Sequence, residues 1–175
     1  ALLHWLKDLI EPGQEGLEAR FRTLGRRLAQ ERDAAEVATR VVRELAQVME
    51  LRSACVLVGD GSQLHGVQVH QGVRTPALLW SDDPLLEVTF RRAGEAPEPE
   101  VPAIREGALF EILPEVKLVL PVVYHGRAVG LLAAGPRLDG RSHDQAAWDW
   151  LGALGEAVAP HLCIAAQARG SVPRA

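Results

Sequence analysis

Two cysteines are the residues of this 175-residue sequence best suited to chemistry, because a thiolate can act as a nucleophile, a redox group or a metal ligand. Cys55 and Cys163 each lie inside an apolar run. Two isolated cysteines make neither a disulfide framework nor a metal site. We therefore interpret both as buried structural thiols of a protein in a reducing compartment.

Histidines could bind a metal ion or a haem, but their spacing does not favour it. His65 and His70 are five residues apart on a predicted strand, so their side chains point to opposite faces. His125 lies on a predicted turn and His143 at a predicted helix start. No pair of histidines, His161 included, has the spacing of metal ligands. We predict no metal site and no bound cofactor.

Acidic and hydroxyl side chains also lack a catalytic arrangement. The adjacent carboxylates Asp82 and Asp83 precede Pro84, and helix capping accounts for Asp83. Ser81 and Ser142 stand in capping contexts and lack the Gly-x-Ser-x-Gly pattern of a nucleophilic serine. The sequence has no glycine-rich phosphate loop either, so we predict that it is not an enzyme.

The composition is that of an ordinary globular domain rather than of a nucleic-acid-binding protein. Hydrophobic residues make up 47% of the sequence, charged residues 24%, and the net charge is −4. Glutamates interleave with the arginines at positions 20 to 27, so we expect no nucleic-acid partner. No signal-peptide pattern occurs. We expect a cytoplasmic segment of a longer protein, or the cytoplasmic part of a membrane-anchored one.

The most apolar stretch, VKLVLPVVYHGRAVGLLAAG at 116–135, is long enough to cross a membrane. Proline, histidine, glycine and arginine interrupt it, and an arginine at the bilayer centre costs about 2.5–3.5 kcal/mol. We predict instead two central strands, 117–124 and 128–134, joined by a tight turn at 125–127. Pro121 cannot donate a hydrogen bond within a sheet, so we expect a bulge or a locally unpaired position there.

Periodicity and capping signals predict the remaining elements, in an order that implies an antiparallel sheet with helices packed on it. The expected elements are helices at 2–10, 17–32 and 34–50, a hairpin of strands at 53–58 and 64–70, a helix at 83–94, a loop at 95–103 and a short helix or strand at 108–113. A capping box of Ser142 and Gln145 begins a long last helix, which Pro160 should kink.

The two apolar strands and their turn, LPVVYHGRAVGLLAAG at 120–135, resemble the corresponding hairpin of GAF domains, which are sensory relatives of the PAS fold. The segments 17–61 and 139–162 are similar to the opening helices, first strand and closing helix of that family. The resemblance implies an α+β fold. Its central antiparallel sheet would have five to six strands with flanking helices, and the long N- and C-terminal helices would pack together. The implied divisions are a lead-in helix or linker at 1–16, a GAF domain at 17–168 and a tail at 169–175.

The same resemblance implies a regulatory, sensory role in a bacterial signalling protein of the sensor-kinase or phosphatase type, with an output domain in the same full-length chain. By analogy with the family, the terminal helices would pair in a homodimer. Their apolar seams have spacing that suits a contact between two helices. The expected interface residues are Leu17, Phe21, Leu24 and Leu28 on the first helix and Leu151, Leu154, Val158 and Leu162 on the last.

The resemblance also implies a pocket between the sheet and the elements that cover one face, where an unknown small ligand would bind. Mapped by order along the chain, the expected pocket residues are Trp80, Phe90, Arg91, Phe110, Val122 and Tyr124. The arginine suits an anionic ligand. An alternative is that the aromatic residues simply fill the core. The domain would then bind no ligand and serve only as a dimerisation and signal-relay scaffold.

The chemistries known for the family do not match this sequence. The chain has no asparagine, which the cyclic-nucleotide motif contains, and residues 64–135 include no cysteine that could attach a bilin. A further alternative is a redox enzyme similar to the free methionine sulfoxide reductases of the family. Cys55 and Cys163 do not match the positions that such an enzyme needs.

Overall fold

The structure is a computed structural model that describes residues 14–59, 63–70, 78–80, 83–92 and 97–170. The lead-in helix expected before residue 11 and most of the expected tail lie outside the described residues. The described residues form a mixed arrangement of helices and one sheet.

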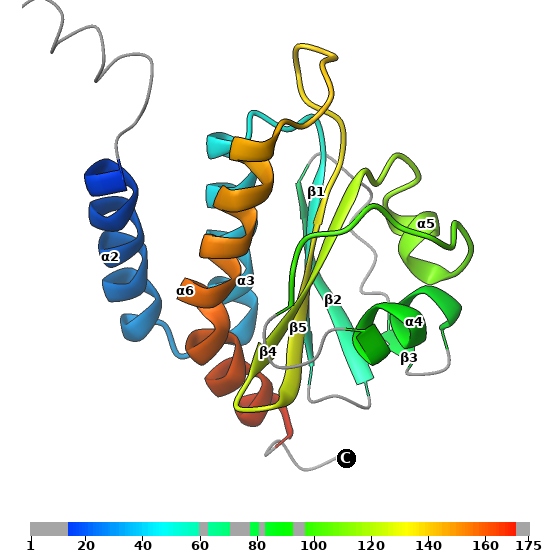
Figure 1. The fold of residues 1–175 in the computed structure, drawn as a ribbon. Coiled ribbons are helices and arrows are strands. Elements are labelled where there is room, and N and C mark those ends of the chain that lie inside the picture. The colour runs from blue at the N-terminus through cyan, green and yellow to red at the C-terminus, as the bar shows by residue number, and fades with distance from the viewer. Residues whose placement is uncertain (1–13, 60–62, 71–77, 81–82, 93–96, 171–175) are drawn as a thin grey trace, which may run out of the picture.

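A five-stranded antiparallel sheet lies at the centre of the described structure (Figure 1). Its strands lie in the order β3-β2-β1-β5-β4. They are β1 (Ala54–Gly59), β2 (Gln63–His70), β3 (Leu78–Trp80), β4 (Leu118–Tyr124) and β5 (Arg127–Ala134). The short strand β3 was not predicted, because three residues are too few to show an alternating pattern.

The hairpin predicted from the apolar stretch is confirmed. β4 and β5 pair antiparallel, and the register ends with Tyr124 opposite Arg127. His125 and Gly126 form the turn between them, with φ angles of 49° and 72°. Two successive positive φ angles match the twist of a two-residue hairpin loop, and glycine adopts them without strain. The prediction of two central strands was wrong for β4, which is the edge strand.

The edge position explains how Pro121 fits into β4 without a bulge of its own. The backbone N–H and C=O of Val119 point outward and bond to Glu100 at 2.9 Å each. Because the bonding direction alternates along a strand, Pro121 also faces outward and loses no bond to β5. The irregularity in the register lies one step further on, between Val122 and Val123.

The first two described helices, α2 (Gln14–Gln30) and α3 (Ala34–Val48), follow the prediction closely. The Asp33 carboxylate accepts a hydrogen bond from the N–H of Ala35 at 2.9 Å and so caps α3, as its sequence signal indicated. The connection between the helices is short, so α2 turns back along α3.

The cap of the last helix, α6 (Gln145–Gly170), differs from the prediction. Asp144 rather than Ser142 caps it, because its carboxylate reaches the N–H of Ala147 at 2.8 Å. Pro160 lies inside the helix, which continues beyond it. Among the helices of the described residues, none is both long and apolar enough to cross a membrane.

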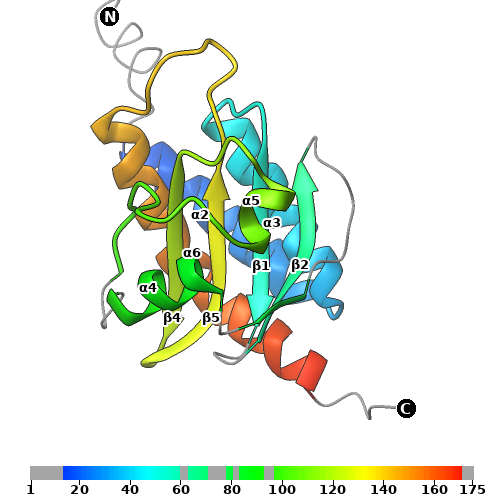
Figure 2. The same cartoon turned by 90° about the vertical axis from the view of Figure 1, so that its right-hand side faces the viewer.

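The two faces of the sheet are covered unequally. In Figure 1, α3 and α6 lie against one face and α2 packs outside them. Only the short helices α4 (Pro84–Arg92) and α5 (Ala108–Ile112) lie against the other face. Figure 2 shows α4 and α5 in front of the sheet and α2 behind it. Each side has its own cluster of buried apolar side chains.

The structure places the residues expected at a dimer interface in the core of the single chain instead. Those of α6, all 0% exposed, are Leu151, Leu154, Val158 and Leu162. Those of α2 are Leu24 and Leu28, which are buried, and Leu17 and Phe21, which are partly buried. The partner of the α2 seam is α6 of the same chain, with the rings of Phe21 and Trp150 5.9 Å apart. A pairing of these helices between two chains would need their outer faces.

Gly130 of β5 provides a test of how closely the sheet is packed. A Cβ atom on this residue would lie 2.6 Å from the carbonyl oxygen of Leu57 and 3.0 Å from Cδ1 of Leu162. We expect Gly130→Ala to lower the free energy of unfolding by about 1–3 kcal/mol, because the backbone of β1 cannot give way. Urea unfolding followed by circular dichroism measures the change.

Gly16→Ala on α2 is the matched control. A Cβ atom there would meet nothing within 4 Å, and alanine favours a helix over glycine. We expect its free energy of unfolding to stay unchanged or to rise slightly. Equal losses in the two variants would contradict a close approach at Gly130.

Candidate functional site

The sheet face beneath α4 and α5 is the candidate ligand-binding face. Side chains alternate along the strands, so that Cys55, Leu57, Leu131 and Ala133 point to this face while Leu132 points to the other. The helices and the chain that follows them, which we call the α4/α5 cover, close the face with apolar side chains. These are Leu85, Leu86, Leu109, Leu113 and Val116. The described part of this face is thus a dry apolar layer under a thin cover.

One carboxylate holds the α4/α5 cover together. Asp83 accepts hydrogen bonds through Oδ1 from the N–H groups of Leu85 and Leu86, at 3.0 and 3.3 Å, and so caps α4 as predicted. Its Oδ2 accepts a third bond, at 2.8 Å, from the N–H of Ala108 at the start of α5. The side chain of Asp83 is buried. It therefore joins the starts of two helices, a second role that its capping signal did not reveal.

Gly107, immediately before α5, leaves room for this carboxylate. Its φ is 117°, a backbone conformation that residues with a side chain rarely adopt. A Cβ atom on Gly107 would lie 2.7 Å from Oδ1 of Asp83 and 2.8 Å from its Cγ. Any other residue here would strain the backbone and push the carboxylate away from the helix starts.

Thr89 brings a polar atom into the apolar layer. It is 1% exposed, and it lies three and four positions after Leu86 and Leu85, on the same side of α4. Its Oγ1 has no hydrogen-bond partner among the described residues. Burying an unsatisfied hydroxyl costs about 1–3 kcal/mol, so this atom is a natural contact for a polar group on a ligand.

Phe90 and Phe110 are the two expected pocket residues that the structure places at this face, partly buried against its apolar cluster. Arg91 is exposed and forms an ion pair with Glu87, one helical turn earlier. It therefore points to solvent rather than into a pocket. Trp80 belongs to β3, but its side chain lies outside the described part of the chain.

Val122 and Tyr124 were expected in the same pocket, but they lie on the opposite face of the sheet. Both pack against the cluster beneath α3 and α6, whereas Val119 of the same strand lies beneath the α4/α5 cover. Alternation along β4 fixes these directions. The order of elements along the chain could not show which alternate set would face the ligand side.

The two cysteines lie on opposite faces of the sheet. Cys55 is fully buried beneath the α4/α5 cover, and burial raises the pKa of its thiol to about 12, so it stays protonated at neutral pH. Cys163 lies on α6 and packs against the other cluster. The two thiols therefore cannot meet within one chain, as a redox mechanism that used both would require.

Histidines are also dispersed. His125 lies exposed at the β4–β5 turn, with its ring 4.2 Å from that of Tyr124. His143 donates through Nε2–H to the carbonyl of Gly135 at 2.9 Å, and partial burial on α6 lowers the pKa of His161. Within the described ranges, no group of three or more His, Cys, Asp or Glu side chains is placed to hold a metal ion.

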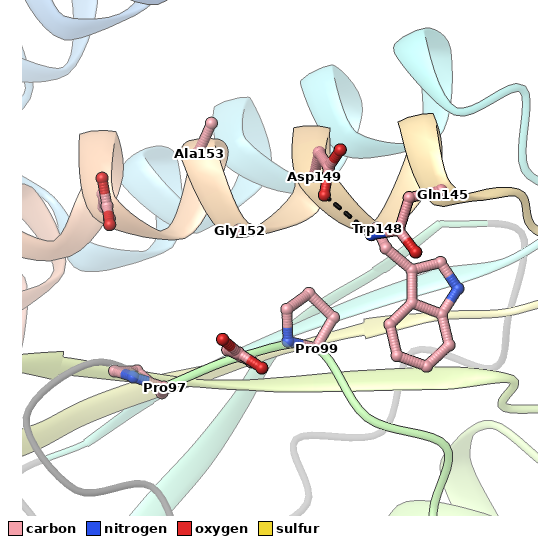
Figure 3. Close-up of a pocket in the computed structure, with 9 residues that line it drawn as sticks. Pro97, Pro99, Gln145, Trp148, Asp149, Gly152 and Ala153 are labelled. Carbon is pink, nitrogen blue, oxygen red and sulfur yellow. Dashed lines mark hydrogen bonds between the residues drawn. The ribbon is translucent and has the colours of Figure 1, made fainter.

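Away from this face, a hollow of about 470 Å³ lies between α6 and the loop that precedes α5 (Figure 3). Figure 3 shows Pro97 and Pro99 on the loop side and Trp148 projecting from α6 at one end. Its acidic lining residues are Glu98, Asp149 and Glu156. Sequence reasoning missed this hollow, because only the pairing of Glu100 with Val119 brings the loop beside α6.

No protein-family model matches the sequence, and the comparison with curated proteins finds no match. Solved structures do match the fold. A methyl-accepting chemotaxis protein, residues 122 to 287, is 17% identical with a TM-score of 0.63, over 79% of this chain and 94% of that one. The GAF domain of a phosphoenolpyruvate-protein phosphotransferase from Coxiella burnetii is 13% identical with a TM-score of 0.64, over 89% and 97%.

Free methionine-R-sulfoxide reductase from Neisseria meningitidis, solved in complex with its substrate, is a third similar structure. It is 14% identical with a TM-score of 0.60, over 85% of this chain and 89% of that one. Most of the other similar structures are GAF domains. The chain therefore has the GAF-domain fold that its sequence resembles. At identities this low the likeness establishes the fold and not the function.

The double role of Asp83 gives a stability prediction. Asp83→Ala would leave the N–H groups of Leu85, Leu86 and Ala108 without their shared acceptor in a buried place. We expect the free energy of unfolding to fall by about 2–4 kcal/mol, as measured by urea titration.

Asp33→Ala is the matched control for this change. Asp33 caps α3 through a single exposed hydrogen bond, so its loss should cost about 1 kcal/mol. A loss for Asp83→Ala no larger than that for Asp33→Ala would show that the link between α4 and α5 contributes nothing.

Proposed function

We propose that the chain is a regulatory GAF domain of a bacterial signal-transduction protein, of the sensor-kinase or phosphatase type, acting in the cytoplasm without catalysing a reaction. The unequal covering of the sheet supports this proposal most directly. One face carries the long helices α3 and α6, with α2 packed outside them (Figure 1), and the other carries two short helices tied by a single carboxylate. Chemotaxis and phosphotransferase proteins carry a similar fold.

A small, mainly apolar ligand would bind between the sheet and the α4/α5 cover. The lining is apolar, and the hydroxyl of Thr89 offers one hydrogen bond to a polar group of the ligand. The cover consists of helices of nine and five residues, which have few side chains to anchor them. Elements with little buried contact open at the lowest free energy, so the ligand would enter by displacing this cover.

The sheet itself would carry the effect of binding to the helices. Leu131 lies beneath the cover, and its neighbour Leu132 lies in the cluster against α6. A Cβ atom on Gly130, which precedes Leu131, would lie 3.0 Å from Leu162 on α6. A shift of β5 would therefore change how α6 packs on the sheet. We propose that α6 transmits this change to an output domain in the same full-length chain.

Two neighbouring leucines give a matched test of this ligand face. Leu131→Phe adds bulk beneath the α4/α5 cover, and Leu132→Phe adds the same bulk on the α6 side, each at a packing cost of about 1–3 kcal/mol. Native mass spectrometry of the full-length protein, purified from a bacterial host, measures any retained small molecule. We expect the wild type and Leu132→Phe to retain it and Leu131→Phe to lose it.

The regulated output decides between this proposal and the scaffold alternative. If no molecule is retained and the output activity of the full-length protein is the same in wild type and Leu131→Phe, the ligand-regulated role is contradicted. The domain would then act as a ligand-free dimerisation and relay element. The packed apolar layer between Leu57, Leu86 and Leu131 is the observation that favours that second candidate.

We further propose a homodimer that uses the outer face of α6. Small or apolar residues recur there with helical spacing, and Ile164 among them is 64% exposed. They are Ala153, Ala157, Pro160 and Ile164. Small side chains allow two helices to approach closely, and a large exposed isoleucine gains from being covered.

The charge substitution Ile164→Arg tests this dimer. We expect sedimentation velocity to show a dimer for wild type and a shift to monomer for Ile164→Arg, because the charge would be buried between the helices. Leu138→Arg is the control, since Leu138 is similarly exposed, at 59%, but lies on the turn before α6. A wild-type monomer at high concentration, or equal shifts in both variants, would contradict this interface.

A further inference from the structure

A cationic cavity of about 300 Å³ lies beside the acidic hollow of Figure 3 and shares Trp148 with it. It is formed by the segment before α5, by Lys117 and Leu118 at the start of β4, and by the turn that leads to α6. Its lining residues include Arg105, Lys117, Leu118, Arg141, His143 and Trp148. It begins where the α4/α5 cover ends, since Lys117 follows the cover residue Val116, but Trp148 of α6 packs on the other side of the sheet from the cover.

The Lys, Arg, Asp and Glu side chains that line this cavity are all of the basic kind. Arg105, Lys117 and Arg141 line it, and its lining includes no Asp or Glu. Within the described ranges none of the three has an ion-pair partner. The carboxylate of Asp139 in the adjoining turn is already bound by the guanidinium of Arg137, at 2.9 and 3.1 Å. In a chain of net charge −4, three unpaired cations around one hollow form a site for an anion.

The wall of the cavity also contains an aromatic ring and an unsatisfied polar atom. The indole of Trp148 lines it and is only partly buried, so a planar group can lie against the ring. His143 is fixed by its bond through Nε2 to Gly135, and its Nδ1 has no described hydrogen-bond partner. The site thus combines three cations, one aromatic surface for stacking and one imidazole nitrogen without a described hydrogen-bond partner.

We propose that this cavity binds a small phosphorylated molecule with a planar ring, of the nucleoside monophosphate class. The three cations match the two negative charges of a phosphate monoester, for which arginine is the preferred partner. Trp148 binds the ring by stacking. The volume of about 300 Å³ is at the lower limit for small-molecule sites, which restricts the ligand to about one nucleotide.

The position of the site gives such binding a consequence. The ligand would touch the first residues of β4 and the segment that enters α6, so it would tie the edge of the sheet to the start of the longest helix. This site is separate from the ligand face beneath the α4/α5 cover, and it stands whether or not that face binds a ligand.

Calorimetric titration of the full chain at low ionic strength tests the proposal with four probes. They are adenosine 5′-monophosphate, ribose 5-phosphate, adenosine and inorganic phosphate. We expect adenosine 5′-monophosphate to bind most tightly and each of the other three, which lacks the ring or the phosphate, to bind at least about tenfold more weakly. Added salt should weaken binding of the charged probes. No heat with adenosine 5′-monophosphate at millimolar concentration, or equal affinity for all four probes, would overturn the proposal.

Variants assign the binding to this cavity. The double variant Arg105→Gln with Arg141→Gln should lower the affinity for adenosine 5′-monophosphate at least about tenfold. Arg22→Gln with Arg26→Gln removes two exposed, unpaired arginines from α2 and should change nothing. Equal affinity in the two double variants would overturn the site.

A second variant tests the aromatic wall. Trp148→Leu keeps apolar bulk but removes the stacking ring, so it should weaken adenosine 5′-monophosphate and leave ribose 5-phosphate unchanged. Circular dichroism spectra and melting curves that match the wild type show that each variant is folded. Unchanged binding of adenosine 5′-monophosphate to a folded Trp148→Leu variant would contradict recognition of the ring by stacking on Trp148.

Discussion

The central strands must be covered on both faces, and the rest of the structure depends on that constraint. Every residue of β1 is buried, as is β5 from Val129 onward, so alternate side chains enter two separate clusters. At about 25 cal/mol per Å² of apolar surface, exposing either face to water would cost more free energy than the net stability of a domain of this size. Helices that precede and follow the strands in the sequence therefore cover one face, and helices from the middle of the sequence cover the other. This requirement explains why α3 and α6, with α2 packed outside them, cover one face while α4 and α5 cover the other (Figure 1).

The two sides of the sheet meet the constraint in different ways, and this difference supports the proposed sensory role. The thick side is built from long helices that contribute many fully buried side chains, among them Leu45, Leu151 and Leu154, so its opening would approach global unfolding. The thin layer is held by apolar contacts and by Asp83, whose three hydrogen bonds align α4 with α5. Because Asp83 bonds to the starts of both short helices, displacing one of them would strain its link to the other. A cover of this kind suits a ligand face, because it can open without disturbing the opposite cluster.

Local signals in the sequence predicted much of this fold, and their limits have physical causes. Caps, turns and periodicity depend on residues a few positions apart, so the cap at Asp33 and the hairpin of β4 and β5 were predicted from the sequence. The turn was predicted at 125–127, and the structure has it at 125–126. The seam of α2 was read correctly as a helix contact, but the spacing of its leucines is the same whether the partner helix is in another chain or in this one. The second bond of Asp83 spans 25 positions, and the side to which Val122 points depends on the register of the sheet. No short segment of the sequence determines either the second partner of Asp83 or the face to which Val122 points.

Close packing of α6 on the sheet links every candidate site to one helix. A Cβ on Gly155 would lie 2.5 Å from Cδ2 of Leu120, and one on Gly130 would lie 3.0 Å from Leu162, so glycines bring α6 against both β4 and β5. Interiors packed this tightly transmit displacement rather than absorb it. The ligand face reaches α6 through β5, and the cationic cavity reaches it directly through the turn that carries His143. In the proposed role, a signal from either place would change how α6 packs on the sheet, and a second chain would detect the change at the outer face of α6, with Ile164.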